Sequence, residues 1–309
     1  MKNTAVLTLK VGTRGSPLAL AQAHEVRDRL HALHEGVAAE IVIINTTGDA
    51  VQDRRLSEVG GKGLFTKEIQ EALLDGRIDL AVHSMKDVET WLPDGTAIAA
   101  VLEREDPRDV FISGKAKSLD ALAAGAVIGT SSLRRQAQIL HRRPDLRVET
   151  LRGNVQTRLR KLAEGVVDAT LLALAGLRRL GSADVATGYI DTDVILPAVA
   201  QGAVGIEIRK GDTTVEAAVA GLNHHPTAVR ISAERAMLAA LDGSCHTPIA
   251  GLAELQGSEM TLTGLVALPD GSQCHRLAQS GPADDAEALG TALGQQLRAR
   301  MPAGFFTKE

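Results

Sequence analysis

The feature that most constrains this chain is the regular alternation of short apolar runs with segments of helical periodicity. The apolar runs of the first third are residues 6–11, 40–44 and 78–82. The helical patterns between them begin at Ser16, a suitable N-cap that Pro17 follows, and at Leu64. Strands that alternate with helices in this way indicate βαβ units and a parallel sheet.

The middle third repeats this alternation, which indicates a second α/β domain. Its apolar runs are residues 110–112, 126–129, 147–151 and 166–172, and its helical patterns begin at Ser118, Ser131 and Asn154. Residues 11–18 and 128–133 are alike, because each has an apolar strand end, Gly-Thr, a small polar turn and a helix start. We therefore expect one shared topology, with a helix N-terminus suited to anions at the carboxyl end of each sheet.

The pattern changes beyond Pro226 to a helix over 229–241, three strand-like runs joined by tight turns, and a closing helix. Consecutive strands joined by turns indicate an antiparallel sheet in a small α+β domain. The expected fold class is therefore α/β, with two similar doubly wound domains and a C-terminal α+β domain. The expected boundaries are 1–102 with 200–220 for the first domain, 103–199 for the second and 221–309 for the third.

Composition excludes several classes of partner. A net charge of −4 and an aromatic content of 2% do not suit a nucleic-acid binder, which presents a basic surface and stacking platforms. No apolar run reaches the ~20 residues of a membrane helix, and the first residues do not resemble a signal peptide. We expect a cytoplasmic protein without nucleic-acid or membrane partners. Its two cysteines, Cys245 and Cys274, indicate neither a disulfide framework nor a zinc site.

Arginines nevertheless gather in the middle of this acidic chain, which indicates a site for a small polyanion. The densest group combines hydroxyls with guanidinium groups at one helix start: Thr130, Ser131, Ser132, Arg134 and Arg135. If the apolar positions of that helix face the core, these groups are free to face a ligand. A capped helix with solvated arginines is the competing interpretation.

Arg152 and Arg158 flank the next helix start, at Asn154. Each alone would be a surface charge, but repetition after neighbouring strands favours an arginine-lined cleft. Arg14 and Ser16 form a similar turn in the first domain, where a capped helix is again the alternative.

Lys86 and Asp87 follow the apolar run 78–82, at the strand end where α/β proteins bind ligands. A plain polar loop is the competing interpretation, and His83 suits a satisfied buried histidine. Cys245 lies in a polar, glycine-containing stretch, whereas Cys274 lies in a strand-like run. We therefore expect Cys245 to be the more accessible of the two cysteines. An inert loop cysteine is the alternative.

Taken together, these segments resemble the porphobilinogen deaminase family. The resemblance runs from near the N-terminus through the Cys245 region, with weaker support beyond it. It rests on an ordered series of motifs: residues 13–19 (TRGSPLA), 47–49 (TGD), 61–65 (GKGLF), 83–87 (HSMKD), 104–109 (REDPRD), 129–135 (GTSSLRR), 151–155 (LRGNV) and 201–203 (QGA).

The resemblance implies two α/β domains that flank a cleft, and a third domain whose Cys245 carries a dipyrromethane cofactor through a thioether. It implies that four porphobilinogen units are added with loss of ammonia, before hydrolysis releases linear hydroxymethylbilane from a monomeric enzyme. Asp87 is then the carboxylate that stabilises positive charge on the pyrrole and assists proton transfer. The implied cofactor-binding residues are Cys245, Lys86, Asp87, Thr130, Ser131, Ser132, Arg134 and Arg135. The implied substrate-binding residues are Arg14, Ser16, Phe65, Arg152, Arg158, Arg179 and Gln201.

Three positions depart from the family pattern. Glu89 stands where proline is usual, Ala200 where glycine is usual, and Ser244 where glycine is common. These departures concern loop geometry rather than chemistry. Two other classes also suit a two-domain anion-binding chain, a solute-binding protein and a cytosolic ligand-sensing domain. The signal peptide of the first and the DNA-reading helix-turn-helix of the second are not seen in the sequence.

Overall fold

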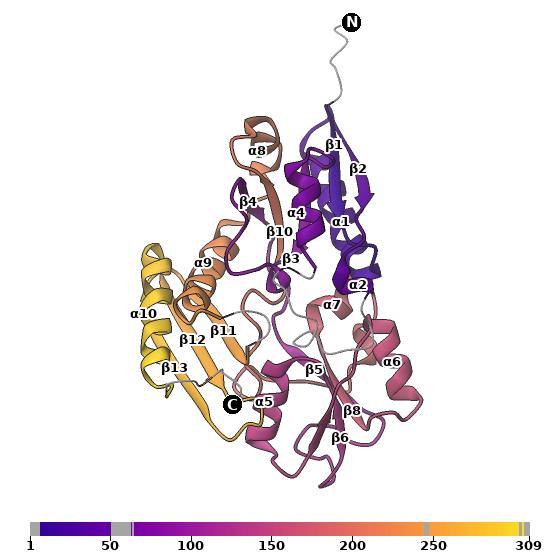
Figure 1. Ribbon diagram of the computed structural model, residues 1–309, viewed down its shortest axis with the longest axis vertical. Helices are drawn as coiled ribbons and strands as arrows, with labels where there is room; N and C mark the ends of the chain where they lie inside the picture. Colours follow the sequence, from indigo (N-terminus) through magenta and orange to yellow (C-terminus); the bar gives the residue numbers. More distant parts are fainter. Residues whose placement is uncertain (1–6, 51–62, 64, 244–246, 303–304, 306–309) are drawn as a thin grey trace, which may run out of the picture. The chain divides into compact units, whose positions relative to one another are not determined.

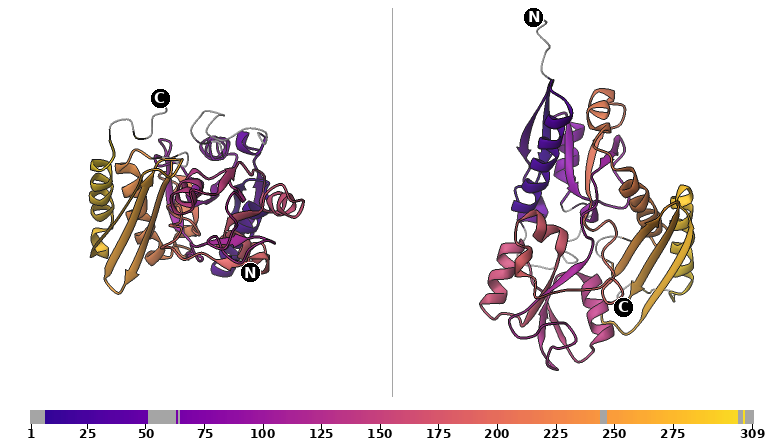
Figure 2. Two further views of the ribbon diagram at one scale, coloured as in Figure 1. Left: turned by 90° about the horizontal axis from the view of Figure 1, so that it is seen from below. Right: turned by 180° about the vertical axis from the view of Figure 1, so that it is seen from behind.

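Three sheets organise the described part of the chain (Figures 1 and 2). The computed structural model describes residues 7–50, 63, 65–243, 247–302 and 305. Contacts divide them into two compact units, one formed by residues up to 105 with 203–228, the other by 106–202 with the chain from 229 onwards. The finer domain boundaries expected from the sequence stay predictions.

The sheet of the first unit is mixed rather than parallel throughout. Its strands, in order across the sheet, are β2 (Val37–Ile43), β1 (Leu7–Thr13), β3 (Leu80–Ser84), β10 (Val204–Arg209) and β4 (Thr96–Val101). β1 runs parallel to β2 and β3, as expected, whereas β10 is antiparallel to both β3 and β4. The three strands expected from the sequence are therefore parallel and β4 runs in the same direction, whereas β10 is the one described strand of this sheet that runs in the opposite direction.

Helices cover both faces of this sheet. The buried side chains of α1 (Pro17–Leu33) and α8 (Thr213–Ala220) belong to one core cluster, and those of α4 (Lys67–Leu74) belong to another. A short helix, α2 (Thr47–Ala50), precedes α4. The predicted start of α1 is confirmed, since the Ser16 hydroxyl accepts a hydrogen bond from the Ala19 N–H at 3.3 Å.

The second sheet repeats the topology of the first, as the paired sequence motifs predict. Its strands, in order, are β7 (Arg147–Glu149), β6 (Val127–Gly129), β8 (Ala169–Ala173), β5 (Asp109–Ile112) and β9 (Gly188–Tyr189). The first three are parallel, and β5 is antiparallel to β8 and β9. The two doubly wound sheets of the expected fold class are therefore confirmed.

The helices of the second sheet are α5 (Leu133–Arg142) against one core cluster and α6 (Val155–Ala163) with α7 (Leu174–Arg179) against the other. A 3₁₀ turn, Ala183–Val185, follows α7. The helix expected from Ser118 is wrong. The chain there forms turns, with Ala121 N–H donating to Ser118, and Gly125 at φ +77° ends them before a helical turn can propagate.

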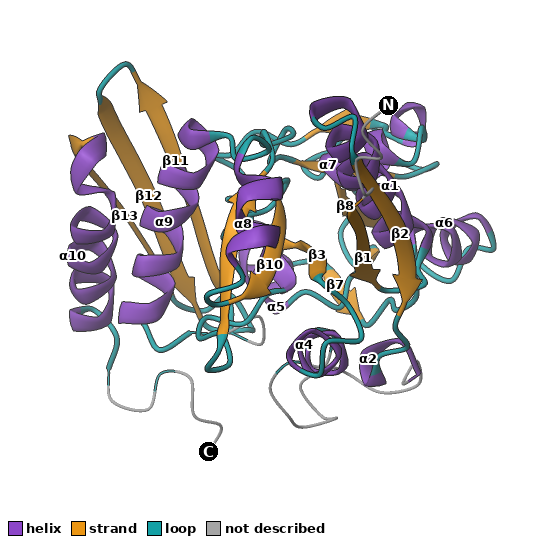
Figure 3. Cartoon of the chain, turned by 90° about the horizontal axis from the view of Figure 1, so that it is seen from above, coloured by secondary structure: helices purple, strands orange, loops and turns teal. Residues whose placement is uncertain are grey.

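The third sheet is antiparallel and consists of β11 (Ile249–Gln256), β12 (Glu259–Ala267) and β13 (Cys274–Pro282), as expected. Figure 3 shows α9 (His225–Ala240) and α10 (Ala286–Ala299) beside these strands. The apolar side chains Ala286, Leu289, Leu293 and Leu297 of α10 are buried. The cluster that includes β11 and β12 also contains Ala137 of α5, so α5 packs between the second and third sheets. None of the helices in the described part of the chain combines the length and apolar character that crossing a membrane requires.

Candidate active site

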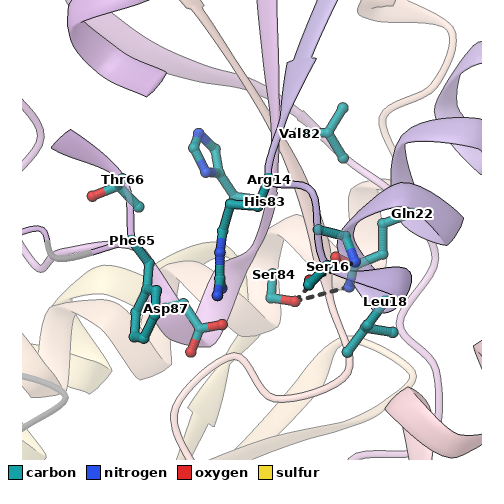
Figure 4. A pocket seen from close by; sticks show the side chains of 11 residues that line it. Arg14, Ser16, Leu18, Gln22, Phe65, Thr66, Val82, His83, Ser84 and Asp87 are labelled. Atoms are coloured by element: carbon teal, nitrogen blue, oxygen red, sulfur yellow. Dashed lines mark hydrogen bonds between the residues drawn. The ribbon is translucent and has the colours of Figure 1, made fainter. Parts of the chain in front are cut away.

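A pocket lies at the carboxyl ends of β1 and β3 in the first unit (Figure 4). The start of α1, the turn before α4 and the end of β3 all contribute to it. The lining residues are Arg14, Ser16, Leu18, Ala19, Gln22, Phe65, Thr66, Val82, His83, Ser84 and Asp87. Four residues expected at the site, Arg14, Ser16, Phe65 and Asp87, are thus brought together although up to 73 positions separate them (14 to 87).

Arg14 and Phe65 form a cation–π pair within this pocket. The Arg14 guanidinium carbon lies 4.1 Å from the centroid of the Phe65 ring. Figure 4 shows the Asp87 carboxylate beside this pair. The pocket therefore presents one positive group, one aromatic face and one carboxylate, which together suit a polar aromatic ligand that carries its own acidic groups.

Asp87 is placed by a short 3₁₀ helix, Met85–Asp87, that continues directly from β3. Met85 is buried and its N–H donates to Ala203 O at 3.0 Å, which ties this turn to the residue before β10. Lys86 is half-buried in the same turn but is not part of the pocket lining. A single strand end thus carries both residues, and only Asp87 contributes to the pocket.

His83, which belongs to the pocket lining, lies against a buried carboxylate, but its Nε2 makes no hydrogen bond of good geometry within the described part of the chain, so its interpretation as a satisfied core histidine stays a prediction. His83 Nε2 lies 2.9 Å from Glu207 Oε2, and both side chains are almost fully buried. Gln70 Nε2 also donates to the Glu207 oxygens, at 3.1 and 3.2 Å. Burial raises the pKa of Glu207, but the contacts with His83, Thr96 and Gln70 outweigh it and hold that pKa below its ordinary value.

The second group of expected site residues surrounds the start of α5. Ser132 caps the helix by accepting from the Arg135 N–H at 3.4 Å, and Thr130 Oγ1 accepts from the Ser132 N–H at 3.1 Å. The Ser131 hydroxyl donates to Leu151 O at 2.6 Å. The expectation that these hydroxyls stand free is therefore wrong, because local backbone groups already engage them; each oxygen retains capacity for a further bond.

Arg134 and Arg135 are also not free, which corrects a second expectation. Both residues are 5% exposed and both bind Asp109, the fully buried first residue of β5. Burial alone would raise the pKa of Asp109, but the two guanidinium groups hold it far below its ordinary value. The reason is packing: α5 lies between two sheets, so side chains of its first turn point inward toward β5 rather than to solvent.

One nitrogen of this buried group stands out. Arg134 Nε is buried and makes no hydrogen bond within the described part of the chain. A buried guanidinium N–H without an acceptor is costly, so the position suits an acceptor that a bound ligand supplies. A carboxylate is the group that the planar guanidinium binds best.

Two of the three remaining arginines expected at the site, Arg158 and Arg179, contact backbone carbonyls near the second sheet. Arg158 Nε donates to Gly153 O at 2.9 Å, and Arg179 Nη2 donates to Gly202 O at 3.1 Å. Arg152 is half-buried in the connection between β7 and α6. That these residues face the pocket of the first unit across a cleft stays a prediction.

Gln201 lies in the buried turn before β10. Its Nε2 donates to Pro107 O at 2.7 Å and to Asp109 Oδ1 at 2.9 Å. The preceding Ala200, where the family usually has glycine, adopts φ +59°, and its N–H donates to the buried Glu234 at 2.6 Å. This bond stabilises the left-handed backbone that alanine otherwise disfavours.

The two cysteines differ in what the structure says of them. Cys245, with Ser244, lies outside the described residues, so its role stays a prediction. Cys274 begins β13 and is half-buried, and burial raises the pKa of its thiol. A raised pKa lowers the thiolate fraction of Cys274 and so makes this thiol less reactive.

Sequence reasoning missed Asp109 and Glu207, the two buried carboxylates that organise these regions. Both occur in runs that are otherwise apolar, 109–112 and 204–208, and every residue of both runs is buried. A lone charge in a strand buried on both faces requires a partner, which is the signal that could have found them. Among the described residues, no group of His, Cys, Asp and Glu is arranged to hold a metal ion.

Comparisons with known proteins cover nearly the whole chain. Residues 9–217 match the family model described as porphobilinogen deaminase, dipyromethane cofactor binding domain, and residues 228–299 match the porphobilinogen deaminase C-terminal domain. The chain is 56% identical to the porphobilinogen deaminase of Paracoccus denitrificans, over 96% of both chains. It is 57% identical to that of Nitrobacter winogradskyi, over 96% of this chain and 95% of the relative. The rice protein named porphobilinogen deaminase, chloroplastic, is 54% identical over 97% of this chain and 86% of its own length.

Proposed function

Because the chain belongs to the porphobilinogen deaminase family, we propose that it is a transferase that joins four porphobilinogen units, with loss of ammonia, into linear hydroxymethylbilane. The reaction takes place on a covalently bound dipyrromethane cofactor, and its product serves tetrapyrrole biosynthesis. The observation that carries the proposal is the pocket in which Asp87, Arg14 and Phe65 converge, in a chain so similar to named deaminases.

The residues present fit the cofactor at the start of α5. Arg134 Nε, which no group in the described part of the chain engages, offers a buried donor, and the neighbouring hydroxyls of Thr130, Ser131 and Ser132 retain acceptor and donor capacity. When bound, the dipyrromethane supplies the pyrrole carbon to which the first substrate unit is joined. The proposed anchor is Cys245, and Lys86, Asp87 and Arg135 complete the proposed binding set.

Asp87 is the proposed catalytic residue. Loss of ammonia from porphobilinogen leaves positive charge on the pyrrole, and a carboxylate beside the ring nitrogen stabilises that charge. The same oxygen can hold the pyrrole N–H proton while the charge develops. Its position on a 3₁₀ turn tied to the sheet keeps the carboxylate oriented before the reaction begins, so no reorganisation is needed at that moment.

The arginines are proposed to hold the acidic side chains of the substrate and of the growing chain. Each porphobilinogen carries an acetate and a propionate, so negative charge accumulates with every addition. In the first unit, Arg14 is oriented by its contact with Phe65, and Ser16 lies beside it at the helix start. Arg152, Arg158, Arg179 and Gln201 are the proposed substrate-binding residues of the second unit.

The test is the stoichiometry of the reaction. Purified protein is incubated with porphobilinogen, and ammonia and hydroxymethylbilane are measured together. We expect four molecules of ammonia for each tetrapyrrole released. Saturable porphobilinogen binding without ammonia release would refute the proposal and would favour the alternative, an anion-binding or ligand-sensing protein. A cytoplasmic location and a monomeric state also belong to the proposal, and cell fractionation and light scattering would test them.

A further inference from the structure

Asp109 is a fully buried carboxylate to which the proposed reaction assigns no part. Four side-chain donors converge on its two oxygens. Arg134 Nη2 donates at 2.9 Å, Arg135 donates through Nε at 3.0 Å and Nη2 at 2.7 Å, and Gln201 Nε2 donates at 2.9 Å. These four bonds match the number of lone-pair sites of an ionised carboxylate, so Asp109 has no capacity left for a ligand.

The charge of this buried group does not balance. Arg134 and Arg135 each carry one positive charge and Asp109 carries one negative charge, so these three side chains, each no more than 6% exposed, have a surplus of one positive charge among the described residues. A buried charge that lacks a partner is costly. The surplus therefore suits one further carboxylate, and Arg134 Nε, which has no partner among the described residues, supplies a donor for it.

The orientation of both guanidinium groups is fixed by Asp109 together with two backbone carbonyls. Arg135 Nη1 donates to Leu171 O at 2.9 Å, so all three of its nitrogens are held. Arg134 Nη1 donates to Leu196 O at 2.7 Å and its Nη2 binds Asp109, so its Nε is the nitrogen left unbonded. A guanidinium group held at two nitrogens cannot rotate, and its third nitrogen therefore points in one direction.

We infer that Asp109 is a positioning residue that holds Arg134 and Arg135 in the orientation in which they bind one carboxylate of the dipyrromethane cofactor. This inference rests on the proposed function, since it takes the ligand of the two arginines to be the cofactor. It assigns Asp109 no contact with substrate or cofactor. Asp109 acts through the arginines, and Gln201 keeps Asp109 in place from the neighbouring turn.

The test compares Asp109→Asn and Asp109→Glu with the matched control Asp120→Asn. Asp120 also pairs with an arginine of α5, since Arg142 Nε donates to it at 2.7 Å, but that pair is exposed. Each protein is produced in cells that lack porphobilinogen, so that it is obtained without cofactor. Porphobilinogen is then added, and intact mass records the rate at which the covalent adduct forms per folded molecule, with the folded fraction taken from circular dichroism.

Asp109→Asn should form the adduct on the order of 10²-fold more slowly than wild type, because misplacing a binding group by about 1 Å has an effect of that size. Asp109→Glu keeps the charge and moves it, so this variant tests the positioning role if the asparagine variant does not fold. It should be folded and still slow, whereas a carboxylate that only neutralised buried charge would leave its rate normal.

A folded Asp109 variant that forms the adduct at the wild-type rate would overturn this inference but not the proposed function. An equal loss of the adduct-formation rate in Asp120→Asn would have the same consequence. A wild-type protein that gains no mass from porphobilinogen would overturn the proposed function and this inference with it.

Discussion

Asp87→Asn separates the charge of the proposed catalytic carboxylate from its size, because asparagine keeps the shape and one acceptor oxygen. Asp87 is half-buried in its pocket, an environment for which an effective dielectric constant of ~20 is appropriate. A positive charge that develops about 4 Å from the carboxylate is then stabilised by about 4 kcal/mol, against about 1 kcal/mol in bulk water. The difference of about 3 kcal/mol corresponds to a rate loss on the order of 10²-fold.

The assay is single-turnover ammonia release from cofactor-loaded protein, with occupancy checked by intact mass for each variant. Asp87→Glu keeps the charge but moves it, so it should retain more activity than Asp87→Asn. Asp94→Asn is the matched control, because it removes an exposed carboxylate from the same connection between β3 and β4. Ammonia release at the wild-type rate from fully loaded Asp87→Asn would refute the reasoning, and Asp49 would be the next carboxylate to test.

Three further predictions follow from the described contacts. Arg134→Leu and Arg135→Leu should each lower cofactor occupancy or block elongation while circular dichroism keeps the wild-type helical content; normal adduct and turnover in both would contradict their proposed role. Glu207→Gln should lower the free energy of unfolding by about 2 kcal/mol at neutral pH in urea titrations, since it removes the buried carboxylate charge to which the Gln70 amide donates. Because the folded-state pKa of Glu207 is depressed, this difference should shrink as the pH falls through that value, and a difference that does not depend on pH would contradict it. The Glu89 carboxylate accepts a hydrogen bond from the Gly63 N–H at 2.7 Å beside the pocket, so Glu89→Ala should raise the KM for porphobilinogen several-fold. Glu89→Gln keeps an acceptor oxygen and should behave as wild type. An unchanged KM in the alanine variant would contradict this positioning effect.

The sequence correctly predicted the helix starts and turns that depend on neighbouring residues alone. Ser16 and Asn154 cap their helices as expected, and the turns of the third sheet follow from their glycine-containing sequences. The helix expected from Ser118 did not form because only six residues separate Ser118 from Gly125, too few for apolar periodicity to decide between a helix and turns.

The sequence predicted the site residues whose positions follow from their own place in the chain, but not the contacts that depend on how the strands and helices pack. Asp87 and Arg14 belong to strand ends, and the position of strand ends could be expected from the order of the elements. The pairing of Arg134 and Arg135 with Asp109 could not, because it depends on β5 lying next to β8 and on α5 packing between two sheets. Antiparallel insertion of β5 and β10 leaves no mark in the periodicity of either strand.

The central claim is that a cofactor built from the substrate is attached to Cys245, and the intact mass of the purified protein tests it most directly. Wild type and Cys274→Ser should both carry a mass excess that equals two pyrrole units, because the Cys274 thiol is half-buried with a raised pKa. Cys245→Ser should have the mass of the bare chain and should release no ammonia from porphobilinogen. An adduct of the same mass on Cys245→Ser, or a wild-type protein without any adduct that still forms hydroxymethylbilane, would contradict the account.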